Sequence, residues 1–254
     1  MTAELVETGV PDWLRRVAVH PPADPHGTNQ ILRNRAKPGQ PRREAAVLIL
    51  FGGPTEANPR GRGGLPVDAD VLLTQRSMHL RQHPGQVAFP GGKCDPTDRG
   101  PVHTALREAE EETGLDPSGV DPISVLPAIF VPPSKFTVTP VIGYWRTPSP
   151  VGVVDKAEAN RVVRIPVAEL LDPANRFQTR HPLGFEAPAF SASGMIVWGF
   201  TAGLLAGLFA VSDWEEPWDH RDVRDLEKTL EEAGMADSLR PWQPDTPSLR
   251  ELSR

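Results

Sequence analysis

The segment 101–115 constrains the fold more than any other part of this 254-residue chain. At about 100° per residue, one face of a helix here carries the apolar residues Val102, Leu106 and Ala109. The opposite face carries the carboxylates of Glu108, Glu111 and Glu112. Proline at the start and glycine just past the end are typical of helix termini, so a helix is predicted over 101–113. Its apolar face must be buried in a layered fold.

Apolar runs elsewhere predict the other elements of a mixed α+β fold. Strands are expected at 45–51, 70–76, 123–130, 136–145 and 161–165, with a hairpin over 177–190. Helices are expected at 12–19, at 167–171 and over about 221–234. The Pro/Gly/Arg-rich tract 21–43 is expected to be irregular, and the proline-rich C-terminal end to be loose.

Residues 187–212 contain no charged side chain, and this length is enough to span a bilayer. Gly199, Gly203 and Gly207 even have the small-residue spacing of packed membrane helices. The stretch nevertheless opens with a loop-like Ala-Pro-Ala-Phe-Ser-Ala-Ser-Gly run, and acidic residues follow it. We therefore favour a buried strand over 195–198 followed by a buried helix over 201–211.

The chain is mildly acidic, with 27 Lys and Arg against 33 Asp and Glu. This balance argues against a general binder of nucleic acids or of anionic membranes. Cys94 is the single cysteine, which excludes an internal disulfide, and the N-terminal sequence shows no secretion signal. We expect a cytoplasmic protein with a small-molecule partner, and whether it forms a homodimer stays open.

Three carboxylates on one helix face repel one another. Hard divalent cations with oxygen ligands, Mg²⁺ or Mn²⁺, would compensate this charge, whereas a solvated acidic face is the alternative. Gly91 and Gly92, upstream of the helix, would let the backbone approach a phosphate closely. This context favours the metal site.

The segment from Arg107 to Leu115 resembles the second half of the Nudix box without a gap. The first half departs from the pattern, because counting back places Lys93 and Arg99 where the box has glycine and an acid. Asp98 stands one residue further upstream, which indicates a longer loop. We expect Asp95 and Asp98 to help hold this loop and assign them no catalytic role.

The segment 72–92 resembles the additional motif of the coenzyme A pyrophosphatase branch of the Nudix superfamily. The matching residues are Leu72, Leu73, Thr74, Arg76, Ser77, Arg81, Gly85, Phe89, Pro90, Gly91 and Gly92. The resemblance implies an α/β/α sandwich with a mixed sheet, in which the box forms a loop–helix–loop. It also implies Mg²⁺- or Mn²⁺-dependent hydrolysis of coenzyme A or acyl-CoA to 3′,5′-ADP and (acyl) 4′-phosphopantetheine.

The resemblance covers most of 44–211 and divides the chain. We expect a Nudix hydrolase domain at 44–216 between an N-terminal arm with a short helix, 1–43, and a C-terminal helix with a loose tail, 217–254.

The resemblance also assigns roles on the acidic helix. Glu108, Glu111 and Glu112 would bind metal, with Glu108 and Glu112 as the first choices. Arg107 would orient a helix glutamate, and a surface ion pair is its alternative. Glu111 and Glu158 are the catalytic candidates beside Arg107. Glu158 is the best candidate general base outside the helix, although a solvated loop acid is an equal interpretation.

The candidates for substrate binding lie before the helix and are Arg76, Arg81, His83, Gly91 and Gly92. Guanidinium groups suit phosphate, but either arginine would also suit an ion pair with the acidic helix. His83 would donate to phosphate or be satisfied by backbone.

Two other functions remain open on the sequence alone. One is the same chemistry on ADP-ribose or another nucleoside diphosphate derivative. The other is a module that senses a nucleotide without hydrolysis, although such a module has no need for clustered carboxylates.

Overall fold

The computed structural model describes residues 5, 9–35, 43–80, 83–132 and 134–239. The main sheet has the strand order β3-β2-β1-β7-β5, while β4 pairs with β1, β6 with β7 and β8 with β2. Its strands are β1 (Arg43–Gly52), β2 (Asp70–Arg76), β3 (Val87–Ala88), β4 (Gly91–Lys93), β5 (Val120–Val125), β6 (Ile129–Val131), β7 (Phe136–Trp145) and β8 (Ala159–Pro166). The pair β1–β7 is parallel and the other pairs are antiparallel, so the sheet is mixed.

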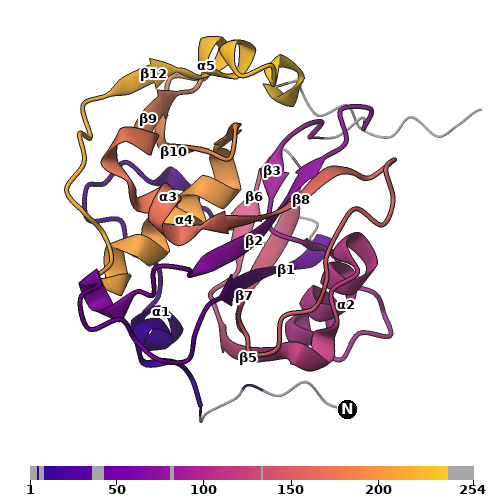
Figure 1. Cartoon of the computed structure of the whole chain (residues 1–254). Helices are drawn as coiled ribbons and strands as arrows, with labels where there is room; N and C mark the ends of the chain where they lie inside the picture. The colour runs from indigo at the N-terminus through magenta and orange to yellow at the C-terminus, as the bar shows by residue number, and fades with distance from the viewer. Residues whose placement is uncertain (1–4, 6–8, 36–42, 81–82, 133, 240–254) are drawn as a thin grey trace, which may run out of the picture.

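The central strand β1 is buried on both faces and sends alternate side chains to two cores. Leu48 and Leu50 join the core beneath α2 (Pro101–Thr113). Ile49 and Phe51 point the other way, into the larger core shared with α4 (Gly199–Ser212). Figure 1 shows α2 on one side of the main sheet and α1 (Arg15–Val19) and α4 on the other. The predicted α/β/α sandwich is therefore confirmed.

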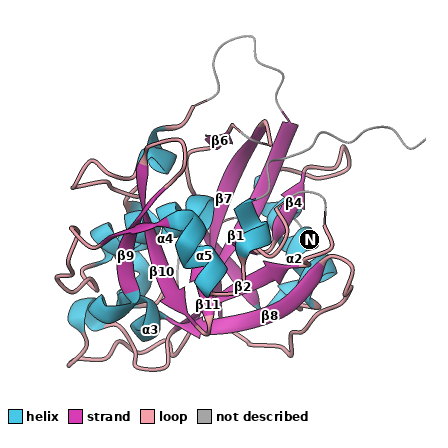
Figure 2. Cartoon of the chain, turned by 90° about the horizontal axis from the view of Figure 1, so that it is seen from above, coloured by secondary structure: helices cyan, strands magenta, loops and turns pink. Residues whose placement is uncertain are grey.

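The smaller sheet has the order β11-β10-β9-β12 and packs beside α4 (Figure 2). Its strands are β9 (Arg176–Arg180), β10 (Glu186–Ala192), β11 (Met195–Val197) and β12 (Val223–Asp225). The predicted hairpin corresponds to β9 and β10, with Ala189 paired to Phe177. The helix α3 (Val167–Leu171) connects the two sheets in sequence, and α5 (Leu226–Glu232) follows β12.

The uncharged stretch folds as most of β10, the strand β11 and the helix α4, so its opening residues, expected to be a loop, form a strand that pairs with β9. Within the described ranges, no helix is both long enough and apolar enough to cross a membrane. Gly203 and Gly207 lie where α4 meets the N-terminal arm: a Cβ at Gly203 would lie 2.8 Å from Ile31 Cβ, and one at Gly207 2.6 Å from Leu32 Cδ1. Their small size therefore serves close packing within this molecule.

Three predicted elements need correction. The strand expected over 123–130 is two strands, β5 and β6, because Pro127 between them has no N–H for the ladder. The helix expected over 221–234 starts at Leu226, because Val223–Asp225 pairs with β9. The tract 21–35 is less irregular than expected, since it contains a 3₁₀ turn at Gln30–Arg33 that packs against α4. Residues 36–42 and the proline-rich end, 240–254, lie outside the described residues.

Candidate functional site

The acidic helix α2 begins at Pro101 and ends at Thr113. Gly114 follows it in the left-handed conformation and donates its N–H to the Glu110 carbonyl. The strand β4 passes directly in front of the helix and places Gly91 and Gly92 beside β1. A Cβ at Gly91 would clash with the backbone of Ala46 and Val47, and one at Gly92 would clash with the Glu108 carboxylate. The backbone contacts and the positive φ make glycine necessary at position 91, whereas a larger residue at position 92 would displace the Glu108 carboxylate.

Glu112 is the carboxyl group of the site whose pKa is raised most. Its Oε2 accepts a hydrogen bond of 3.2 Å from the Gly91 N–H. Burial first, and the charges of Glu108 and Glu158 to a lesser degree, raise the pKa of Glu112 from 4.5 to about 7 against the lowering effects of Gly91 and Arg76. Groups with such perturbed pKa values cluster at functional sites.

Glu108 lies one helical turn before Glu112, and its side chain is 17% exposed. Burial raises the pKa of Glu108, although Arg107 lowers it. Arg107 Nη1 lies 2.9 Å from Glu108 Oε1 and 3.1 Å from Glu111 Oε2. Arg107 thus forms both contacts that the sequence left open. One is with the buried helix glutamate Glu108, and the other is a more exposed ion pair with Glu111.

The principal partner of Arg107 is Asp98, whose side chain is only 2% exposed. Arg107 Nε and Nη2 donate to the two Asp98 oxygens at 3.0 and 2.9 Å. His103 Nδ1 lies 2.7 Å from Asp98, and Thr104 Oγ1 donates to it at 2.9 Å. These donors, Arg107 first, hold the pKa of Asp98 far below its usual range, and Asp98 raises that of Arg107.

Arg107 also donates to the Lys93 carbonyl at 3.1 Å, so it ties the loop after β4 to the helix. Asp98 was predicted to hold this loop, but its ion pair with Arg107 was not predicted. The available signal was the one-residue offset that places Asp98, instead of Arg99, in the acidic position of the box.

Glu111 is more exposed than its neighbours, at 60% of its side chain, and pairs with Arg107 away from Glu112. Across the described part of the chain, no group of three or more His, Cys, Asp and Glu side chains is arranged to hold a metal ion. The three helix glutamates therefore do not converge on one point in this conformation.

The charges of Arg76 and Glu158 act on Glu112: Arg76 lowers its pKa and Glu158 raises it. The side chain of Arg76 forms no ion pair within the described residues, and its Nε is buried without a hydrogen-bond partner. Glu158 is exposed at the start of β8, and its carbonyl accepts a hydrogen bond from the Ser77 N–H. The structure thus brings β2, β8 and α2 together around Glu112.

His83 follows in the loop between β2 and β3 with a positive φ of 53°. Burial first, and then the charge of Arg76, lower the pKa of His83, which favours the neutral imidazole. Gln86 contacts His83 and donates to the Ser238 carbonyl at 2.9 Å, which joins this loop to the C-terminal segment. Arg81 lies outside the described residues.

Comparison with known proteins identifies the family. The family model for the NUDIX domain matches residues 57–183. NudL of Escherichia coli K12, named an uncharacterised Nudix hydrolase, is 39% identical over 173 residues, which cover 65% of this chain and 81% of the relative. The relative of the same name from Shigella boydii serotype 4 gives the same values.

Solved structures of low identity also match. A Nudix hydrolase from M. smegmatis, RenU, is 22% identical with a TM-score of 0.39, over 52% of this chain and 75% of that one. A Nudix hydrolase from Nitrosomonas europaea is 12% identical with a TM-score of 0.42, over 72% and 78%. The assignment rests on the family model and the sequence relatives: the chain belongs to the Nudix family of hydrolases.

Proposed function

We propose that this Nudix hydrolase cleaves the diphosphate bond of coenzyme A or an acyl-CoA, releasing 3′,5′-ADP and (acyl) 4′-phosphopantetheine. The segment 72–92 carries the proposal, since it resembles the motif of the coenzyme A branch at eleven positions. This segment leaves β2 at Arg76 and returns at Gly91 to contact Glu112. We also propose that the enzyme acts in the cytoplasm, because its single cysteine suits a reducing compartment.

The residues of the site fit a divalent metal ion in their chemistry. Glu108 and Glu112 offer the carboxylate oxygens that Mg²⁺ and Mn²⁺ prefer. Both have raised pKa values, and a cation would favour their ionised forms. The missing Cβ of Gly92 leaves the Glu108 carboxylate accessible from the loop. When bound, Mg²⁺ or Mn²⁺ supplies Lewis-acid polarisation of the diphosphate and neutralises its charge.

The surrounding residues have distinct proposed roles. Arg76 at the end of β2, with Arg81 and His83 later in the sequence, binds the substrate phosphates, and the backbone of Gly91 and Gly92 permits their close approach. Arg107 orients Glu108 and is itself fixed by Asp98.

As the oxygen of the attacking water bonds to one phosphorus, the bridging P–O bond breaks, the other phosphate group leaves with that oxygen, and the water proton passes to a carboxylate. Glu158 is the proposed acceptor of this proton, because it is exposed and its charge acts on Glu112. Glu111, which is more exposed than Glu108, acts with the metal-binding pair and is the alternative acceptor. Loss of activity in Glu158→Gln but not in Glu111→Gln would separate the two.

The decisive experiment is hydrolysis of coenzyme A, acetyl-CoA and ADP-ribose with Mg²⁺ or Mn²⁺, with product identification by chromatography. We expect 3′,5′-ADP from the first two substrates and much slower turnover of ADP-ribose. Equal or faster turnover of ADP-ribose would overturn the coenzyme A specificity. Glu108→Gln and Glu112→Gln are each expected to lower kcat by orders of magnitude, whereas Glu110→Gln, on the exposed face of α2, serves as the matched control. Normal turnover in the first two variants would overturn the metal-site assignment.

A further inference from the structure

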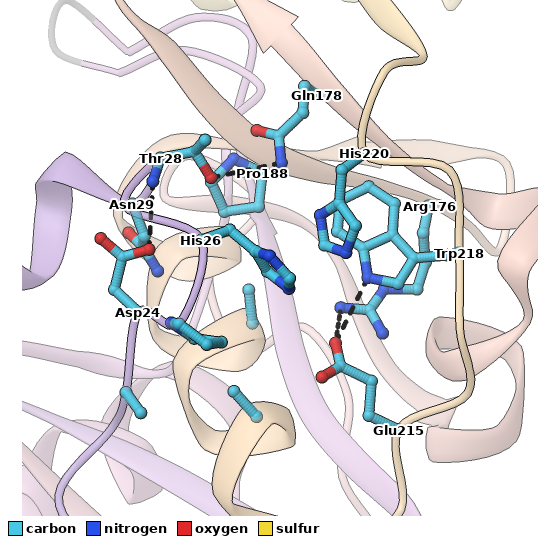
Figure 3. Close-up of a pocket in the computed structure, with 14 residues that line it drawn as sticks. Asp24, His26, Thr28, Asn29, Arg176, Gln178, Pro188, Glu215, Trp218 and His220 are labelled. Carbon is cyan, nitrogen blue, oxygen red and sulfur yellow. Dashed lines mark hydrogen bonds and ion pairs between the residues drawn. The ribbon is translucent and has the colours of Figure 1, made fainter.

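A pocket lies at the smaller sheet, between the N-terminal arm, the start of β9 and the segment after α4 (Figure 3). Of the residues assigned to the Nudix site, none that the structure describes lines it. Its cavity of about 30 Å³ is enough for about two water molecules or a group of a few non-hydrogen atoms. We call it the Arg176 pocket, after the cation at its base.

Arg176 is a buried charge with incomplete hydrogen bonding. Its side chain is only 1% exposed, and its Nη2 lies 2.6 Å from Glu215 Oε1. Nε and Nη1 are both buried without a hydrogen-bond partner. The guanidinium carbon lies 4.6 Å from the centre of the Trp218 ring and 5.4 Å from that of Phe190. Aromatic faces stabilise the charge but do not accept its N–H groups as a carbonyl or an oxyanion would.

Other polar atoms around the pocket also lack partners. His220 packs against Trp218 and His26, with 3.8 Å between ring centroids in each case, and its Nδ1 is buried and unpartnered. Asn29 Oδ1 and Gln178 Oε1 are buried and unpartnered as well. Asn29 Nδ2 donates to the Gly203 carbonyl at 2.7 Å, which fixes the orientation of that amide. Buried polar groups of this kind are normally hydrogen-bonded, so a cluster of them around one pocket indicates a binding site.

The chemistry of the free groups indicates what the occupant is. The unpartnered nitrogens of Arg176 can only donate, and they require acceptor oxygens. Each neutral imidazole of His26 and His220 donates through one ring nitrogen, and a protonated ring donates through both. A cation in the pocket would be repelled by the positive charge of the buried Arg176 guanidinium.

We propose that the Arg176 pocket binds a small oxyanion head group, the phosphate or carboxylate of a small molecule, through Arg176 Nε and Nη1. The group lies against His220 and Trp218, and Glu215 keeps its contact with Nη2. The size of the cavity admits the head group only, so the remainder of the ligand extends outward past His26, which is exposed. A hydroxyl or N–H of the ligand satisfies Gln178 or Asn29. This proposal does not depend on the substrate of the Nudix site.

The test is an NMR titration of the full chain with inorganic phosphate or with sodium acetate, in the presence of EDTA and at constant ionic strength set with chloride. We expect saturable shifts of the Trp218 indole and His220 imidazole resonances with at least one of the two anions. The anion that saturates at the lower concentration identifies the preferred head group. Equal shifts with chloride alone, or no saturable shift with either anion, would overturn the proposal and leave water as the occupant.

Variants locate the bound anion. Arg176→Lys keeps the positive charge but removes Nε and Nη1, and is expected to weaken binding at least tenfold. Arg224→Lys, the same change at a more exposed ion pair of β12, is the matched control and should leave binding unchanged. His26→Ala at the exposed rim tests the site without altering its buried base, and is expected to weaken binding severalfold. Glu112→Gln separates the two sites, because binding here should survive it. Wild-type affinity in both Arg176→Lys and His26→Ala would overturn the proposal.

Discussion

The replacement Glu112→Gln is expected to stabilise the metal-free protein while it abolishes hydrolysis. Glu112 is held mostly out of water by β4 and α2, and burial is the largest cause of its raised pKa. A glutamine has nearly the same shape as the protonated acid, and its Oε1 can accept the Gly91 N–H as Glu112 does. The variant therefore removes an unfavourable buried charge and retains the hydrogen bond.

The size of the effect follows from the pKa. A change from 4.5 to about 7 on folding corresponds to about 3 kcal/mol of preference for the neutral carboxyl. The folded protein binds the proton more tightly than the unfolded chain, so this contribution to stability is full below pH 4.5 and is lost as the pH rises through 7. The advantage of the variant is consequently small near pH 5 and about 2–3 kcal/mol at pH 8.

Urea unfolding in EDTA at pH 5 and pH 8 measures this difference directly. Glu110→Gln, exposed on the same helix, is the control and should change the free energy of unfolding by less than about 0.5 kcal/mol at either pH. Destabilisation of Glu112→Gln at pH 8, or the same change at both pH values, would refute the reasoning. Adding Mg²⁺ should stabilise the wild-type protein and have little effect on the variant, because a bound ion stabilises the folded state.

Three further outcomes are expected. Gly92→Ala pushes the new methyl group against the Glu108 carboxylate, and should lower kcat by at least about tenfold with the fold retained, as measured by steady-state kinetics and circular dichroism. Asp98→Asn weakens the buried anchor of Arg107 and should lower the free energy of unfolding by about 2–4 kcal/mol; an unchanged urea midpoint would contradict this role. Arg76→Lys should raise KM for coenzyme A about tenfold with a smaller change in kcat, and an equal fall in kcat would indicate a role in the chemical step instead.

The local signals of the sequence were sufficient for the elements that carry the chemistry. The bounds of α2, β2 and β7 are those predicted, because proline, glycine and apolar periodicity act within a few residues. The helix after β11 was also predicted in place of a membrane span, although it begins two residues earlier than expected.

Long-range pairing explains most of what the sequence analysis missed. The segment Val223–Asp225 has a helix-like pattern, but pairing with β9, about 45 residues away in sequence, makes it a strand. In the site, the bond between Asp98 and Arg107 depends on how the loop after β4 folds back on α2. The spacing showed that this loop is one residue longer, but it did not show which side chain the loop would bury.

The Arg176 pocket could not be predicted because its residues come from distant segments without a shared motif. His26 lies on the N-terminal arm, Arg176 at the start of β9 and His220 after α4. Stability alone does not account for Arg176, because an apolar side chain packed against Trp218 and Phe190 would avoid the desolvation of a guanidinium with two unpaired donors. An oxyanion in the pocket satisfies those donors, and the energetic argument for a ligand is therefore independent of any resemblance to known proteins.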